Sequence, residues 1–135
     1  MKNSEMKSKV VVLGNRLTPR MGGDRKAAFI QAWAIVKAGG LELAVKGVTF
    51  GNRQEALKRL TAYAPEQVRA VLVPEPTNPV DHAAVAVMVG VQNGRGLYRL
   101  GYLPADFAPA AVSLKVRGLR VLDGYIRGAR LALTV

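Results

Sequence analysis

Short apolar segments alternate with turn residues from residue 41 onward, and this spacing is the strongest constraint on the fold. The segments cover residues 41–46, 67–73, 84–91, 97–103, 116–122 and 125–134. Strands and helices do not alternate throughout, so a doubly wound parallel sheet is not favoured. Many short strands separated by Gly- and Pro-containing turns are typical of small barrels. The pattern therefore predicts a mainly β fold: a small antiparallel β-barrel with two or three short helices.

The residues before this region carry a different pattern. Residues 1–23 are predicted to form a basic tail with one short strand at the β-branched residues 10–13, ended by Gly14. A helix is predicted over residues 25–38, with Asp24 as its N-cap and two glycines at its end. We therefore divide the chain into a tail (1–23), a helix packed on the domain or on a partner (24–40) and a barrel domain (41–135).

The predicted helix at residues 25–38 has two apolar stripes. One contains Phe29 and Trp33, whose spacing favours a place in the core. A helix that is apolar on two sides packs between two layers, and the second layer is either the same core or another copy of the chain. A homodimer through residues 25–38 is therefore one alternative.

Two further helices are predicted within the barrel domain. Asn52 is expected to cap the first, with Glu55 completing a capping box. Pro104 is expected to open a short helix over residues 105–112.

The charge of the chain is strongly unbalanced, with 20 Lys+Arg, 9 Asp+Glu and a net charge of +11. Residues 1–26 carry +5, residues 27–83 carry +1 and residues 84–135 carry +5. The bases of the last two predicted strands are Lys115, Arg117, Arg120, Arg127 and Arg130. They occupy odd and even positions, so they cannot all share one face of a sheet unless a bulge or turn intervenes. Such an excess of cations favours contact with nucleic acid over a generic solubilising surface.

Most catalytic chemistries lack their residues. There is no Cys and only one His, which excludes disulfides, thiol nucleophiles and Cys- or multi-His metal sites. Asp81-His82 is the only acid–His neighbour pair, and no serine lies in a nucleophile signature. The apolar runs are too short for a signal peptide or a membrane span. We therefore expect a cytoplasmic binding module that is not an enzyme and holds no metal or cofactor.

A proline-rich stretch at residues 74–79 separates two predicted strands and cannot form a regular element. Asn78 precedes Pro79, and its side chain is expected to tie the turn by bonding nearby backbone amides. Asp81 then lies at the lip of the following buried strand, where it serves either the turn or a ligand.

Several of these segments together resemble one family. They are Gly47-Val48-Thr49-Phe50, Asn52-Arg53-Gln54, residues 74–87 and Leu100-Gly101-Tyr102-Leu103-Pro104. Over about residues 43–133 the chain resembles a HIRAN domain. The resemblance implies a modified OB-like β-barrel, and it implies a module that binds single-stranded DNA and grips the free 3′-hydroxyl end.

The resemblance also implies roles for individual residues. Asp81 matches the acid that bonds the terminal 3′-hydroxyl, and a carboxylate suits a hydroxyl donor. Val80 stands where the DNA-capturing members carry a stacking tyrosine, and Tyr102 stands at a position facing the backbone phosphates. Tyr125 and Arg127 fall near the place of another stacking aromatic.

Two further arginines belong to the candidate nucleic-acid-binding residues. Arg53 stands at a predicted helix start, where the helix dipole disfavours a cation. This cost suggests a salt link to Asp81 or a phosphate contact, and the alternative is a solvated side chain without either role. Arg99 lies on the strand that leads to Tyr102.

The expected function is single-stranded DNA binding, with or without 3′-end capture, in repair, replication or a mobile-element context. The alternative is a protein-interaction or dimerisation module that does not bind nucleic acid. RNA or ribosome binding is a third interpretation, which rests on charge alone.

Overall fold

The computed structural model describes residues 3–92, 94, 96–111 and 114–134. In chain order its elements are α1 (Asn3–Leu17), the 3-10 helix η1 (Thr18–Met21), α2 (Arg25–Ala38), β1 (Gly40–Ala44), α3 (Arg53–Leu60), the 3-10 helix η2 (Pro65–Gln67), β2 (Val68–Pro74), β3 (Val85–Val91), β4 (Tyr98–Tyr102), α4 (Ala108–Ala111), β5 (Lys115–Leu122) and β6 (Gly128–Thr134). None of the described helices is long and apolar enough to cross a membrane.

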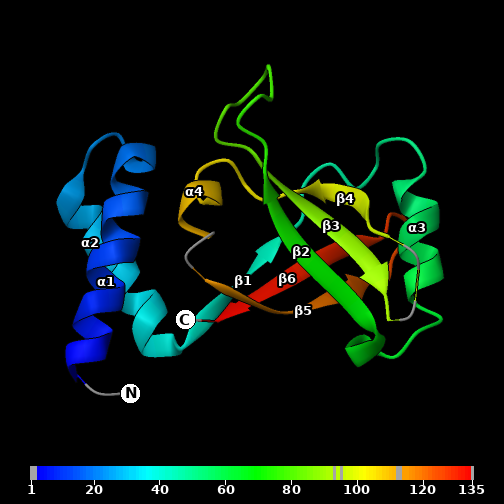
Figure 1. Ribbon diagram of the computed structural model, residues 1–135, viewed down its shortest axis with the longest axis horizontal. Coiled ribbons are helices and arrows are strands. Elements are labelled where there is room, and N and C mark those ends of the chain that lie inside the picture. The colour runs from blue at the N-terminus through cyan, green and yellow to red at the C-terminus, as the bar shows by residue number, and fades with distance from the viewer. Residues whose placement is uncertain (1–2, 93, 95, 112–113, 135) are drawn as a thin grey trace.

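The strands form two antiparallel sheets of three strands each. One has the order β1-β6-β5 and the other the order β2-β3-β4. The sheets cross each other in the middle of the molecule, with the α1–α2 pair at one end and α3 at the other (Figure 1). The short helix α4 lies between the helix pair and the sheets.

The predicted closed barrel is wrong, because the described strands leave both sheets open. The sheets are joined at one bridge, where Lys46 N donates to Tyr102 O at 2.7 Å and Tyr102 N donates to Lys46 O at 2.9 Å. Gly47 then turns the chain away with a φ of 77°, so the bridge does not extend into a ladder. At the far side β2 packs against β5, yet no ladder joins these strands among the described residues. The fold is a mixed α/β structure.

One apolar core is shared by both sheets and by the helices. On β6 the alternation is clear, since Ala129, Leu131 and Leu133 are buried while the residues between them are half-buried. Strand β3 is buried along most of its length, as its continuous apolar run predicts. Because the period of a strand is two, the outward residues of β6 form a face of their own.

The N-terminal region differs most from its prediction. Residues 10–13, predicted as a strand, lie in the middle of α1. Val10, Leu13 and Leu17 are buried at i, i+3 and i+7, which is the spacing of one helix face. Gly14 does not end an element but allows α2 to approach, because a Cβ there would lie 2.6 Å from Phe29 Cδ2. Packing against α2 outweighs the β preference of the valines.

Helix α2 begins and ends as predicted. The Asp24 side chain accepts a hydrogen bond from Ala27 N at 3.0 Å, and Gly39 closes the helix with a φ of 85°. The core expectation is wrong for Trp33, which is 38% exposed, whereas Phe29 is partly buried against the core. The residues that α2 buries most completely are Ala28 and Ala32, which are 0% exposed.

The remaining predictions are confirmed in part. The segments predicted at residues 84–91, 97–103, 116–122 and 125–134 contain strands that pair as the hairpins β3–β4 and β5–β6, with residues 93 and 95 outside the described part. Asn52 does precede α3, but its side chain makes no capping bond, because its φ of −94° and ψ of 18° are not the extended values that a capping box uses. The helix predicted over residues 105–112 is reduced to α4, and residue 112 lies outside the described part.

Candidate nucleic-acid interface

The proline loop, residues 75–84, joins β2 to β3 and projects beyond the sheets (Figure 1). Its shape is held by side chains. Asn78 Oδ1 accepts hydrogen bonds from Val80 N at 2.9 Å and from Asp81 N at 3.1 Å. Asp81 Oδ1 accepts one from Ala83 N at 2.9 Å. The predicted turn-fixing role of Asn78 is confirmed, and Asp81 also takes part in the turn.

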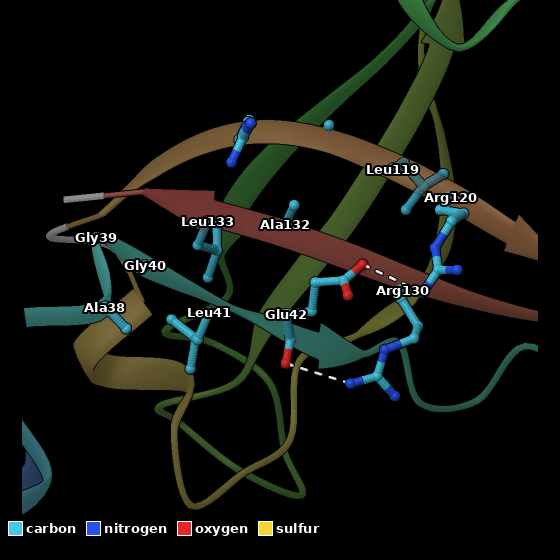
Figure 2. Close-up of a pocket in the computed structure, with 12 residues that line it drawn as sticks. Ala38, Gly39, Gly40, Leu41, Glu42, Leu119, Arg120, Arg130, Ala132 and Leu133 are labelled. Carbon is cyan, nitrogen blue, oxygen red and sulfur yellow. Dashed lines mark hydrogen bonds and ion pairs between the residues drawn. The ribbon is translucent and has the colours of Figure 1, made fainter. Parts of the chain in front are cut away.

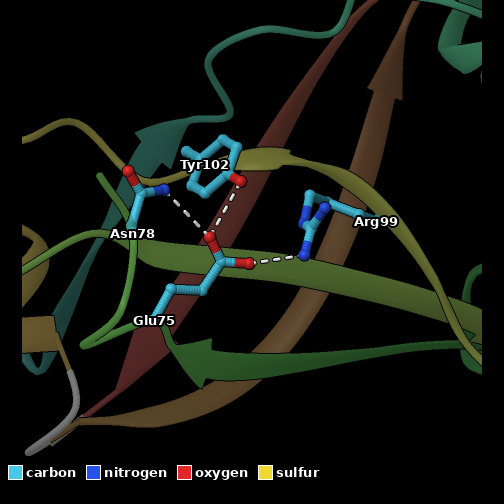
Figure 3. A network of polar contacts seen from close by, with 4 residues as sticks. All are labelled: Glu75, Asn78, Arg99 and Tyr102. Atoms are coloured by element: carbon cyan, nitrogen blue, oxygen red, sulfur yellow. Dashed lines mark hydrogen bonds and ion pairs between the residues drawn. The ribbon is translucent and has the colours of Figure 1, made fainter. Parts of the chain in front are cut away.

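Glu75 anchors this loop to β4 (Figure 3). Its Oε1 accepts hydrogen bonds from Asn78 Nδ2 at 3.1 Å and from the Tyr102 hydroxyl at 2.9 Å. Its Oε2 pairs with Arg99 at 2.6 Å. The sequence analysis missed Glu75, and its only local signal was an acid between two prolines at the end of a strand.

The ionisation of Glu75 follows from these contacts. The Asn78 hydrogen bond lowers the pKa of Glu75 below its ordinary value of 4.5, helped by Tyr102 and Arg99 and opposed by burial. Burial and the bond to Glu75 raise the pKa of Tyr102, so this phenol is a neutral donor at neutral pH. At neutral pH the network therefore pairs an ionised Glu75 carboxylate with a protonated Tyr102 hydroxyl that donates to it.

Asp81, Val80 and Tyr102 meet at a shallow pocket of about 370 Å³. The pocket is lined by Asn78, Val80, Asp81, Ala84, Tyr102, Leu103 and Ala105. Asp81 is half-buried, whereas Val80 is 94% exposed at the tip of the loop. The structure thus brings together three of the residues that the sequence analysis selected.

Arg53 lies outside that pocket. Its Nη1 donates to Gly47 O at 2.6 Å, and its guanidinium stacks over the Phe50 ring at 5.8 Å from the centroid. The expected salt link to Asp81 is not among the described contacts of Arg53. The cation at the helix start instead closes the turn between β1 and α3.

Arg53 lines a second pocket, of about 580 Å³, between α3 and β4. The pocket is lined by Phe50, Gly51, Asn52, Arg53, Glu55, Ala56, Arg59, Tyr98 and Arg99. We call its charged and aromatic part, which consists of Phe50, Arg53, Glu55, Arg59, Tyr98 and Arg99, the arginine–aromatic groove. Phe50 is 68% exposed and Tyr98 is 39% exposed, so both rings are accessible. Three guanidinium groups thus share one depression with two rings and one acid.

The sequence analysis missed three of the arginine and aromatic members of this groove, namely Phe50, Arg59 and Tyr98. One signal was present: Arg53, Ala56 and Arg59 are three residues apart and therefore near one face of α3. The register that brings Tyr98 beside that face depends on the β3–β4 hairpin, which is a long-range feature. Burial raises the pKa of Tyr98, and the charge of Arg59 opposes this effect.

The groove continues along α3 into a smaller pocket of about 240 Å³. Ala56, Arg59 and Tyr98 line both pockets. The smaller pocket adds Tyr63, which is 43% exposed. The accessible aromatic surface therefore extends past the end of α3.

Tyr125 and Arg127 lie in the turn between β5 and β6, near the start of α3. Arg127 N donates to Gln54 Oε1 at 2.8 Å, and Gln54 Nε2 donates to Arg127 O at 2.7 Å. Tyr125 is fully exposed. Neither residue is among those that line the described pocket at Asp81.

Comparison with family models, with curated proteins and with solved structures found no match. The resemblance to HIRAN domains therefore stays a prediction. Among the described residues, no group of three His, Cys, Asp or Glu side chains is placed to hold a metal ion.

Proposed function

We propose that this chain binds single-stranded nucleic acid, with DNA favoured, along the arginine–aromatic groove. The observation that carries the proposal is the shared position of three arginines and two exposed rings between α3 and β4. Arginines neutralise backbone phosphates, and the release of counterions supplies sequence-independent affinity. Exposed rings stack on unpaired bases, and each stacked base contributes about 1–3 kcal/mol.

Arg99 extends the groove towards the proline loop. It lines the groove, pairs with Glu75 at 2.6 Å, and its guanidinium lies 5.8 Å from the Tyr102 ring centroid. A nucleic-acid strand that leaves the groove past Arg99 would reach the pocket at Asp81. The resemblance to HIRAN domains supports binding of the nucleic acid's 3′-hydroxyl end in this pocket. The Asp81 carboxylate can accept a hydrogen bond from a hydroxyl, whereas it repels a 3′-phosphate.

The salt dependence of affinity tests the groove. A labelled single-stranded oligonucleotide is titrated at several salt concentrations with wild type, Arg59→Gln and Lys58→Gln. Lys58 and Arg59 both lie in the last turn of α3, but of the two only Arg59 lines the groove. Arg59→Gln should reduce the log–log salt slope by about 0.7, and Lys58→Gln should leave it unchanged. Equal slopes for the two variants, or a flat slope for wild type, would contradict the proposal.

End recognition is tested separately at Asp81. The Asp81→Asn variant keeps an oxygen for the bond from Ala83 N, so the turn should persist. Wild type should prefer a 3′-hydroxyl oligonucleotide over a 3′-phosphate one, and the variant should lose this preference. If both proteins bind both ends equally, Asp81 serves the turn alone. A DNA-against-RNA competition of one sequence decides between the two polymers.

Self-association through α2 is the second candidate function. It is favoured by Ile30 and Trp33, which are 63% and 38% exposed and three residues apart on one helix. Light scattering of wild type and Ile30→Lys tests it. A dimer that the substitution dissociates would support association through this helix, and a monomeric wild type would exclude it.

A further inference from the structure

The outward face of the β1-β6-β5 sheet carries a second cluster of cations. The register places Arg120 beside Arg130, and Lys115 beside Thr134. Lys115 and Arg120 have opposite parity on β5, yet a bulge between Val116 and Gly118 brings both to the outward face. A bulge was one of the two conditions under which basic residues of opposite parity could share a face, and it brings Lys115 and Arg120 to one side of the sheet.

This face is hollow at its centre (Figure 2). The depression measures about 630 Å³. The basic sheet face, as we call it, consists of Glu42, Arg117, Gly118, Arg120, Arg130 and Ala132. Small residues occupy the middle of the sheet, because Gly118 and Ala132 are register partners. A bound chain can therefore approach the sheet backbone closely while arginines surround it.

Among the described residues that line this depression, Glu42 is the one acid. Its Oε1 lies 3.5 Å from Arg120 Nη2, and its carbonyl oxygen accepts from Arg130 Nη2 at 3.4 Å (Figure 2). The Arg120 and Glu42 side chains are 61% and 41% exposed, so this pair is solvated and weak. The arginines therefore remain accessible to a stronger anion.

No aromatic residue lines this depression among the described residues. Without a ring, the face offers no stacking for unpaired bases, and its attraction acts on phosphates. A duplex hides its base faces and carries one charge per about 1.7 Å of axis. Five residues of a β-strand span about 16 Å, so the basic side chains from Lys115 to Arg120 would lie opposite several phosphates of a duplex.

We propose that the basic sheet face binds the phosphodiester backbone of double-stranded nucleic acid. This site is separate from the arginine–aromatic groove, because the residues lining the two depressions do not overlap. The occupant follows from charge complementarity and from the absence of rings on the described face. The proposal does not depend on single-strand binding by the groove.

A blunt duplex of about 20 base pairs, titrated at 50 and 200 mM salt, tests this site. With about four phosphate contacts, wild type should lose on the order of 100-fold in affinity between the two salts. The double variant Arg117→Gln/Arg120→Gln should lose only about 10-fold, because two contacts are gone. The charge-matched control has one substitution in α3 and one in α2, Lys58→Gln/Lys37→Gln, and should behave as wild type.

Two further variants separate binding from folding. Glu42→Gln removes the acid from the face and should tighten duplex binding several-fold. Gly118→Val adds bulk without charge; a Cβ there meets nothing within 4 Å, so the strand should accept it. It should weaken duplex binding by filling the hollow, with a melting temperature near that of wild type.

The outcomes separate this inference from the proposed function. If Arg117→Gln/Arg120→Gln binds duplex as tightly as the control, or if polyglutamate displaces duplex as well as unlabelled duplex does, the inference is wrong. If wild type binds duplex through these arginines but binds no single strand, the inference stands and the proposed function fails. If Arg59→Gln lowers single-strand affinity alone and Arg117→Gln/Arg120→Gln lowers duplex affinity alone, both are supported.

Discussion

The arginine–aromatic groove and the basic sheet face carry the same charges and differ in what lies between them. In the part of the chain that the structure describes, each is lined by three arginines and one glutamate. Each also has one arginine in an ion pair, Arg99 with Glu75 in the groove and Arg120 with Glu42 on the sheet. The groove adds the rings of Phe50 and Tyr98, whereas the face has glycine and alanine.

Charge alone therefore does not predict which form of nucleic acid a surface favours. Guanidinium groups serve either form, because both carry phosphates. Aromatic rings add stacking energy only where the nucleic-acid bases are unpaired. Small side chains on a sheet leave room for a duplex, whose base faces are hidden. A net charge of +11 is therefore compatible with two sites of different preference.

Removing both rings should have the largest effect and should abolish the difference in single-strand binding between the two surfaces. The double variant Phe50→Ala/Tyr98→Ala should lose about 100-fold in affinity for a single strand, since each stacked base contributes about 1–3 kcal/mol. Its affinity for a duplex should not change. Fluorescence anisotropy with both ligands, at one salt concentration, measures the two affinities.

The matched control for the rings is Tyr125→Ala, which removes a fully exposed ring outside the groove. A loss for this control equal to that of the double variant would move the stacking site to the β5–β6 turn. Thermal unfolding of each variant checks the fold, because Tyr98 is partly buried. If single-strand and duplex affinities fall together, the two surfaces are one site.

The connection between the two sheets gives the second prediction. A Cβ at Gly101 would overlap the carbonyl oxygen of Lys46 and would lie 2.7 Å from Val45 Cγ1. Gly101→Ala should therefore destabilise the protein by about 1–3 kcal/mol, as overpacking does. Urea unfolding measures this change in free energy.

Gly118→Ala is a control for glycine replacement, since no atom lies within 4 Å of a Cβ there. Its φ lies outside the left-handed region, so neither a clash nor backbone strain is expected, and stability should change by no more than about 0.5 kcal/mol. The outcome that contradicts the account is equal stability of Gly101→Ala and wild type. The bridge would then leave room for a side chain, and the two sheets would be less closely joined than the structure indicates.

Local signals predicted the elements whose ends are defined by nearby residues. Asp24 and Gly39 delimit α2, and the apolar runs around Asp123-Gly124 form the β5–β6 hairpin. The parity of the C-terminal basic residues did not predict the bulge before Gly118, but it identified a bulge or turn as the condition for a shared face. These predictions succeeded because capping, strand period and turn chemistry act within a few residues.

Features that depend on distant segments were not predicted. The helical spacing of Val10, Leu13 and Leu17 was visible in the sequence, but the β preference of the valines concealed it until α2 provided a partner. Closure of a barrel depends on how β2 meets β5, which no local pattern encodes. The groove joins Arg59 of α3 to Tyr98 of β4, and only the folded chain brings these residues together.

The smallest effect concerns the acid that ties the proline loop beside the groove. The pKa of Glu75 is lowered, chiefly by the Asn78 hydrogen bond, so its ionised form stabilises the fold at neutral pH. This contribution is complete above the ordinary pKa of 4.5 and is lost as the pH falls through the lowered value. Glu75→Gln should lower the free energy of unfolding at pH 7 and should approach wild type at acid pH.

Urea unfolding of wild type and Glu75→Gln between pH 7 and pH 3 measures this difference, with the exposed Glu66→Gln as a variant of equal charge change. The gap between wild type and Glu75→Gln should narrow as the pH falls, because wild type loses what the variant already lacks. A gap that stays constant would assign the loss to packing rather than to ionisation. Duplex binding at neutral pH should be the same in both proteins, since Glu75 does not line the basic sheet face.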